Sequence, residues 1–382
     1  MEKQKISVAD VCRFLLTLVL SLASGVLVLA FAGWMLVSVG VPGSGVQTNA
    51  ADLAIMDRFD MQMTNRISSA LDGVLAIEKV YWLNDNDLIA PEPDPNNFGT
   101  AQPADMEGFL EDAQFLLKGE RTLFSTDLET YRGEAVTYYL DKTIMVITWR
   151  QNIDNFVYTI SEVKIAHPSQ FRRFLADGAF GSDKQYYTTT MAQTVNAVTA
   201  SSGDYYKYRQ YGIVVYDGQV MQFNNQIDTC FINDEGDMIF SRQGELTTLE
   251  EAQKFVDENN IRFSLAFGPV LVDNHQKEVS PGYFVGMVDL LRSRAALAKM
   301  GDLHYLLVTA NYGDLGECQD SITVYKFTDQ MMAFGVEKAY ALDGGQTAVI
   351  VTNDQLINRP DWGEQRMISD IIYFATALQD GG

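Results

Sequence analysis

The protein has 382 residues, enough for one large domain or two small ones. Hydrophobic residues make up 47% and aromatic residues 11% of the chain, so a substantial core can form. The 50 acidic residues outnumber the 28 basic ones and give a net charge of −22, which argues against nucleic-acid binding, because that needs a basic footprint.

The first feature along the chain is an apolar segment, with no charged residue between Phe14 and Ala51. Its most apolar part, residues 14–41, is longer than the roughly 20 residues that cross a bilayer core. We therefore predict a single transmembrane helix over 14–41, preceded by a cytoplasmic tail of residues 1–13.

The residues beside this segment predict its orientation. Lys3, Lys5 and Arg13 precede it, so we expect a single-pass protein of the cell membrane with a cytoplasmic N-terminus and an extracellular main domain. A cleaved signal peptide is the alternative, because residues 30–32, Ala-Phe-Ala, match the small-residue cleavage pattern. The apolar run continues past that point, which favours an uncleaved signal-anchor.

Residues 42–105 connect the membrane segment to the outer domain. Residues 42–50 are a predicted hinge, and apolar residues recur at every fourth position over 51–83, as on one face of a helix. That stripe fits either self-association of the chain or packing on its own domain. The next segment, 84–108, is rich in Pro, Asn and Asp and is predicted to be a loop.

The outer domain is predicted to be α+β, with mixed β-sheet and flanking helices, because helical and strand periodicities are interspersed. Expected helices cover 106–117, 168–176, 246–260 and 323–335. Expected strands cover 144–149, 156–166 (half-exposed), 304–312 and 339–345, and hairpins cover 211–223, turning at Asp217-Gly218, and 229–240.

Cysteine and histidine residues give no sign of a metal centre. Cys230 and Cys318 fall in the outer part and either pair or remain two separate thiols. The three histidines are scattered, and neither zinc-ligand nor EF-hand spacing occurs. The sequence therefore predicts no metal and no cofactor.

The stretch AYALDGGQTAVIV, residues 339–351, interrupts an apolar strand with Asp343 and two glycines. A plain Asp-Gly turn is one explanation. The other is a ligand site, in which the glycines let backbone N–H groups approach an anionic oxygen and the following Gln and Thr add polar side chains.

Four blocks of sequence, in order, resemble the phosphodiester glycosidase family, which includes uncovering-enzyme-like domains that act on N-acetylglucosamine-1-phosphodiesters. They are NAVTASSGDYYKYRQYGIVVYDGQV (196–220), FSLAFGPVLVDN (263–274), RSRAALAKMGDLHYLLVT (292–309), and GVEKAYALDGGQTAVIVTNDQLINRP (335–360) with GEQRMISDIIYFATAL after it. The resemblance implies that residues 162–382 form the family's domain and that 106–161 are the N-terminal part of the outer domain.

The chain departs from the family pattern at three points. The glycine and serine run after Asp343 reads Gly-Gly-Gln-Thr-Ala, and Ser202 stands where the family usually has Asn. Residues 310–313, Ala-Asn-Tyr-Gly, replace an Asp-Gly-Arg sequence. These changes alter the expected pocket more than the expected fold.

The resemblance implies hydrolysis at C1 of a sugar-1-phosphodiester, through an oxocarbenium-like transition state that a carboxylate assists. The implied catalytic residues are Asp343, Asp204 and His304, although His304 also fits a core position. Arg294 is the expected phosphate clamp, with a structural ion pair as its alternative. The other implied substrate-binding residues are Ser202, Gly203, Tyr205, Arg209, Gly344, Gly345, Gln346, Thr347 and Arg366.

We therefore expect a membrane-anchored extracytoplasmic hydrolase that cleaves sugar-1-phosphodiesters in cell-envelope glycans, such as an exopolysaccharide. Its partner is the sugar-phosphate or polysaccharide substrate, for which a local basic groove could form from Arg172, Arg173, Arg209, Arg292 and Arg294. The altered motifs favour an alternative, a non-catalytic protein of the same fold that binds sugar phosphates or assembles the envelope. A sensor is disfavoured, because a 13-residue tail leaves no room for a signalling domain.

Overall fold

The computed structural model describes Leu83 and residues 89–379, except positions 130, 132, 155, 205, 284 and 312–321. The predicted tail, transmembrane segment, hinge and nearly all of the 51–83 stripe lie outside the described residues, as does Cys318. Within the part that is described, no helix is both long and apolar enough to cross a bilayer.

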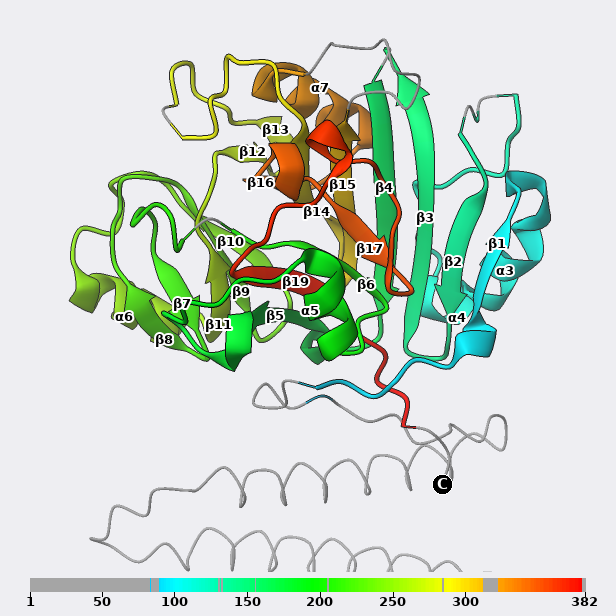
Figure 1. Ribbon diagram of the computed structural model, residues 1–382, viewed down its shortest axis with the longest axis horizontal. Helices are drawn as coiled ribbons and strands as arrows, with labels where there is room; N and C mark the ends of the chain where they lie inside the picture. Colours follow the sequence, from blue (N-terminus) through cyan, green and yellow to red (C-terminus); the bar gives the residue numbers. More distant parts are fainter. Residues whose placement is uncertain are drawn as a thin grey trace, which may run out of the picture. The chain divides into compact units, whose positions relative to one another are not determined.

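An antiparallel sheet of nine strands is the centre of the fold (Figure 1). In spatial order its strands are β1 (Phe98–Ala101), β2 (Val136–Leu140), β3 (Ile144–Ile153), β4 (Phe156–Ile165), β15 (His304–Asn311), β14 (Arg294–Gly301), β16 (Lys338–Leu342), β12 (Val270–Asp273) and β13 (Gln276–Lys277). The two predicted parts of the outer domain, 106–161 and 162–382, therefore contribute to one sheet.

Two smaller antiparallel sheets have five strands each. One runs β18 (Gln355–Leu356), β17 (Ile350–Thr352), β6 (Thr199–Ser202), β19 (Asp370–Phe374) and β5 (Phe171–Leu175). The other runs β10 (Met238–Ser241), β9 (Thr229–Asn233), β11 (Ile261–Leu265), β7 (Val214–Tyr216) and β8 (Gln219–Gln222).

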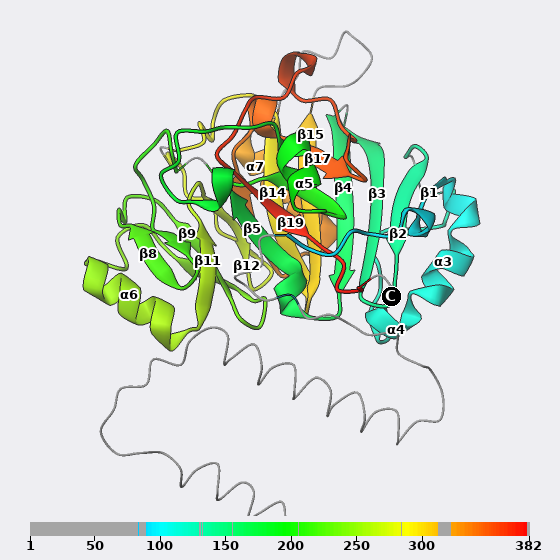
Figure 2. The same cartoon turned by 60° about the horizontal axis from the view of Figure 1, so that its bottom comes forward.

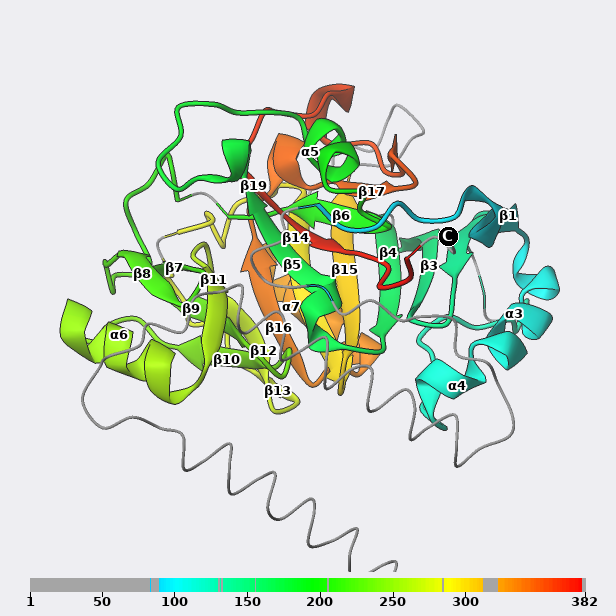
Figure 3. The same ribbon diagram turned by 90° about the horizontal axis from the view of Figure 1, so that it is seen from below.

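Apolar side chains hold these sheets together in layers. Ile350 and Phe374 of the β18–β5 sheet share a buried cluster with Leu297 and Tyr305 of the central sheet. Outside the β18–β5 sheet lies α5 (Thr188–Thr194), which buries Met191 (Figure 3).

Helices cover the remaining faces. The other face of the central sheet packs on α3 (Glu107–Asp112), α4 (Gln114–Leu117) and α7 (Val324–Phe334). The β10–β8 sheet packs on α6 (Leu249–Glu258), at the flank of the molecule in Figure 2. Short 3₁₀ turns occur at η1 (Pro95–Asn97), η2 (Pro103–Asp105), η3 (Pro168–Gln170), η4 (Ala176–Gly178), η5 (Gly345–Thr347) and η6 (Asp361–Gly363).

Local sequence signals predicted most of these elements. The Thr248 hydroxyl accepts the Glu251 N–H at the start of α6, and α7 ends where Gly335 adopts φ +76°. The β7–β8 hairpin turns at Asp217 and Gly218, both with positive φ, as a two-residue hairpin turn requires. The predicted helices at 106–117, 246–260 and 323–335 are confirmed.

Two predictions were wrong because tertiary pairing overrides local propensity. Residues 168–176, expected to be a helix, form η3, the strand β5 and the start of η4, and β5 pairs with β19 from Phe171 to Leu175. Residues 84–108, expected to be a loop, contain β1, which adds an edge strand to β2.

Candidate active site

The Asp-Gly-Gly turn follows β16 at one end of the central sheet and leads through η5 into β17. A Cβ at Gly344 would lie only 2.3 Å from the carbonyl oxygen of Ser293. Gly345, with φ +69°, donates its N–H to the same carbonyl oxygen at 3.0 Å. The glycines thus allow close packing against the start of β14, and the Gly345 N–H is not directed at a ligand as the sequence suggested.

Asp343 is a partly exposed carboxylate with guanidinium groups around it. Its Oδ2 contacts Nη2 of Arg366, and its side chain is 15% exposed. Burial raises the pKa of the Asp343 carboxyl, and Arg366, the Thr347 hydroxyl and Arg209 act in the opposite direction. The cations thus favour the ionised carboxylate that burial disfavours.

An aromatic ring lies beside the Arg366 guanidinium. The Arg366 Cζ atom is 5.9 Å from the ring centroid of Tyr208, a residue that is 47% exposed. The loop 206–211 that follows β6 therefore contributes both this ring and Arg209 to the surroundings of Asp343.

The strand β6 brings the second predicted block to the same turn. The Ser202 hydroxyl donates to the Thr347 carbonyl, and the Thr347 hydroxyl donates to the Gly344 carbonyl at 2.8 Å. Gln346 donates through its side-chain amide to the Glu364 carbonyl at 3.3 Å. These three side chains brace the turn, and Tyr205 lies outside the described residues.

Asp204, expected to be catalytic, is part of a buried charge cluster. Arg173 donates from Nη2 to Asp204 Oδ2 and from Nε to Asp370 Oδ2, both at 2.9 Å, and all three side chains are fully buried. Asp204 Oδ2 also accepts the Ala266 N–H at 2.8 Å. Since the carboxylate is closed off by these donors, the structure places it as a scaffold beneath the site.

Gly203 fits this cluster because it has no side chain. A Cβ at this position would lie 1.9 Å from Asp370 Oδ2. The Gly203 N–H donates to the Asp370 carbonyl at 3.1 Å. Burial raises the pKa of Asp370 to about 7, against the opposing effect of Arg173, and its Oδ1 has no hydrogen-bond partner among the described residues.

This raised pKa predicts a pH-dependent stability. Asp370 binds its proton more tightly in the folded protein than in the unfolded chain. Its contribution to the free energy of unfolding is therefore complete below about pH 4 and is lost as the pH rises through about 7. Between pH 5 and pH 8 the free energy of unfolding should fall by on the order of 2 kcal/mol from this group. Asp370→Asn keeps an acceptor for Arg173 and should remove that fall.

Urea denaturation at the two pH values measures the effect. Asp183→Asn is the control, because the Asp183 side chain is fully exposed. An unchanged pH dependence in Asp370→Asn would show that another group titrates.

Arg294 was expected to bind phosphate, but it is buried and its guanidinium group donates hydrogen bonds to backbone carbonyl oxygens instead. It donates to the carbonyl oxygens of Ile322 at 3.0 Å, Gly286 at 2.6 Å and Met287 at 3.0 Å, and also to Leu290. Burial lowers the pKa of Arg294 to about 10. The Arg294 guanidinium thus holds the loop 286–290 in place. Because its N–H groups are already bonded to these carbonyl oxygens, Arg294 does not fit the role of a phosphate-binding residue.

His304 lies at the opposite end of the central sheet from Asp343. In β14, Gly301 pairs with His304, whereas Ala295 pairs with Leu342, directly before Asp343. His304, implied by the family resemblance to be catalytic, therefore does not lie beside Asp343.

The His304 ring belongs to a separate polar cluster. Its Nε2 lies 2.8 Å from Glu162 and its Nδ1 lies 3.1 Å from Glu120, which also binds Lys164 at 2.8 Å. β4, predicted to be half-exposed, is buried over nearly its whole length, and these contacts pair its charged side chains, Glu162 and Lys164.

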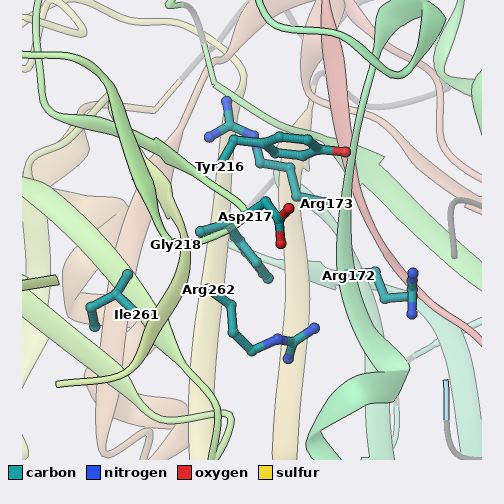
Figure 4. Close-up of a pocket in the computed structure, with 8 residues that line it drawn as sticks. Arg172, Arg173, Tyr216, Asp217, Gly218, Ile261 and Arg262 are labelled. Atoms are coloured by element: carbon teal, nitrogen blue, oxygen red, sulfur yellow. The ribbon is translucent and has the colours of Figure 1, made fainter. Parts of the chain in front are cut away.

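The expected basic groove is divided between separate places. Arg172 and Arg173 line a cavity of about 230 Å³ between β5, β11 and the β7–β8 turn, together with Arg262, Tyr216 and Asp217. Figure 4 shows Asp217 among the three arginine side chains. Arg172 donates to the Tyr373 hydroxyl at 3.0 Å. Arg209 and Arg294 do not line this cavity.

Sequence reasoning missed a second carboxylate beside the turn. Asp361 of η6 accepts a hydrogen bond from the Ser293 hydroxyl, and burial raises the pKa of its carboxyl. Its only sequence signal is a polar residue between Pro360 and Trp362. No cluster of three or more potential metal ligands occurs in the described part of the chain, and Cys230 is a buried free thiol.

Comparison with known protein families finds one match, which covers just under half of the chain. The model of the phosphodiester glycosidase family matches residues 193–375. This match contains Asp343, Arg366, Arg209 and the β6 block, but not β5 with Arg173. No curated protein sequence matches the chain significantly.

Two solved structures have folds similar to that of this chain. The catalytic domain of zebrafish N-acetylglucosamine-1-phosphodiester alpha-N-acetylglucosaminidase, auto-inhibited by its pro-peptide, aligns with a TM-score of 0.50 and 16% identity, over 69% of this chain and 92% of that domain. A hypothetical protein from Synechocystis aligns with a TM-score of 0.48 and 13% identity, over 63% of this chain. The chain spans 64% of the length of the Synechocystis protein.

Proposed function

We propose that this protein is a glycosidase that hydrolyses the C1–O bond of sugar-1-phosphodiesters. The observation that carries the proposal is Asp343 itself, a partly exposed carboxylate in contact with Arg366 and within the electrostatic reach of Arg209. It directly follows the central strand β16, inside the segment that matches the phosphodiester glycosidase family. That arrangement places an acid beside cations, as this reaction requires.

The chemistry assigns different tasks to the two kinds of group. As the C1–O bond breaks, positive charge develops on the sugar ring, and a carboxylate stabilises it or attacks C1. The phosphate leaves with the electron pair of the broken bond, so guanidinium groups that bind its oxygens lower the barrier. We assign the first task to Asp343 and the second to Arg366 and Arg209.

The location is a further part of the proposal. A transmembrane helix over 14–41 would hold the domain outside the cytoplasm, next to envelope glycans that contain sugar-phosphate linkages. The apolar sequence of this segment and the basic residues before it support that location.

Release of free sugar tests the activity. We expect the full-length protein, purified in detergent, to release N-acetylglucosamine from an alkyl diester of N-acetylglucosamine 1-phosphate. Binding of the diester with no release would favour the non-catalytic alternative, and neither binding nor release would refute both.

Arg366→Gln tests the phosphate-binding task. Loss of one charged hydrogen-bond donor should lower kcat/KM by about 10- to 100-fold. Arg359→Gln is the matched control, because Arg359 is an exposed arginine of the same loop. Equal kcat/KM values for the two variants would contradict the assignment.

A further inference from the structure

Trp362 is the most exposed large apolar side chain of the described residues, at 81%. Leaving an indole in water forfeits the favourable burial that such a large side chain usually gains. Trp149, the other tryptophan that the structure describes, is 2% exposed and lies in the core. Burial in the fold therefore does not account for the indole at this position.

The backbone of Trp362 adds a second observation. Its φ and ψ are +60° and +8°, in the left-handed region that a bulky side chain rarely adopts. Gly or Asn would adopt this conformation at lower cost. Strained backbone of this kind concentrates at ligand sites, where the surrounding structure holds it in place.

The turn that carries Trp362 is fastened to the candidate site. On one side the carboxylate of Asp361, a residue that is 5% exposed, accepts a hydrogen bond from the Ser293 hydroxyl. On the other side the side-chain amide of Gln346 donates to the Glu364 carbonyl oxygen at 3.3 Å. The backbone N–H of Arg366 donates to the backbone carbonyl oxygen of Gln346, also at 3.3 Å. The turn that carries the indole is thus hydrogen-bonded to the start of β14 and to η5, close to Arg366, the residue that contacts Asp343.

We propose that Trp362 is a sugar-binding residue, whose indole stacks on a pyranose ring of the bound glycan. The C–H groups on one face of a pyranose ring are apolar, and an aromatic face covers them well, while the hydroxyl groups remain free to bind polar partners. The inference rests on the proposed function for its choice of ligand, and it makes Trp362 a determinant of sugar affinity rather than a catalytic residue.

The test compares Trp362→Asn with Trp362→Phe in the full-length protein, using N-acetylglucosamine 1-phosphate as the probe in titration calorimetry. Asn removes the ring and suits the left-handed backbone, so its Tm should equal or exceed that of the wild type. We expect its Kd to rise at least 10-fold. Phe keeps an aromatic face and should change the Kd by less than about 3-fold.

The outcomes separate this inference from the proposed activity. Binding that depends on Trp362, without hydrolysis of any diester, would refute the glycosidase and keep the sugar-binding residue. Hydrolysis with an unchanged Kd in Trp362→Asn would overturn the inference alone, as would a wild type that does not bind the probe. Conversion of a dimer to a monomer in Trp362→Asn, measured by light scattering, would instead identify a contact between two copies of the chain.

Discussion

Asp343→Asn is expected to lower kcat for sugar release by at least about 1,000-fold, with the fold intact. The substitution keeps the size of the side chain but removes the negative charge that stabilises or attacks C1 in the transition state. Because the Asp343 side chain is 15% exposed and burial raises the pKa of its carboxyl, the neutral amide should not destabilise the turn. Initial rates at saturating substrate measure the effect.

Asp302→Asn is the control for that experiment. The Asp302 side chain is 99% exposed and lies in the turn between β14 and β15, two residues before His304, at the far end of the sheet from Asp343. Its kcat should equal that of the wild type. Sugar release that survives in Asp343→Asn would remove Asp343 from the reaction.

Arg173→Leu is expected to reduce the free energy of unfolding by about 3 to 5 kcal/mol, the cost of leaving buried carboxylates without their cation. Arg173 links Asp204 and Asp370 and also donates to the Ser264 carbonyl. The cluster connects β5, β19 and the segment after β6, so its loss should also disturb the base of the candidate site. Urea denaturation measures the stability.

A surface arginine provides the comparison. Arg150 pairs with Glu134, and their side chains are 28% and 56% exposed. Arg150→Leu should cost no more than about 1 kcal/mol, because solvent screens such a pair. Similar losses in Arg150→Leu and Arg173→Leu would mean that the buried cluster is not a special source of stability.

Short-range signals in the sequence predicted much of the fold. A threonine cap, a terminal glycine and an Asp-Gly turn act on neighbouring residues, so α6, α7 and the β7–β8 hairpin could be placed without knowledge of the tertiary structure. The strand β5 could not be placed in this way. Its partner β19 is nearly 200 positions further along the chain, and Arg172 and Arg173 are unusual in a buried strand.

For the candidate site, the sequence indicated the turn at Asp343 but not the contacts that its other residues make. The Asp-Gly-Gly sequence indicated Asp343, and the neighbouring blocks indicated Arg209 and Arg366. The sequence did not reveal that Asp204 is closed off by Arg173 and Ala266, because those contacts join residues 31 and 62 positions apart. The sequence also could not show which arginines donate hydrogen bonds to backbone carbonyl oxygens, as Arg294 does, and which lie beside the Asp343 carboxylate.

The charge of the chain sets a condition on the proposed substrate. A protein with a net charge of −22 repels a polyanionic glycan over most of its surface, so productive binding depends on local cations such as Arg366 and Arg209. This repulsion also disfavours unproductive binding elsewhere on the domain. Selection of sugar-phosphate linkages would then depend on the surroundings of Asp343 rather than on the general attraction of a polymer.

Hydrolysis in ¹⁸O-labelled water tests the central claim most directly, because it identifies the bond that breaks. Attack at C1 leaves the bridging oxygen on phosphorus, so the phosphomonoester product should contain no ¹⁸O when examined by ³¹P NMR. A phosphomonoester that carries one ¹⁸O atom would show cleavage of the P–O bond, and the protein would be a phosphodiesterase rather than a glycosidase.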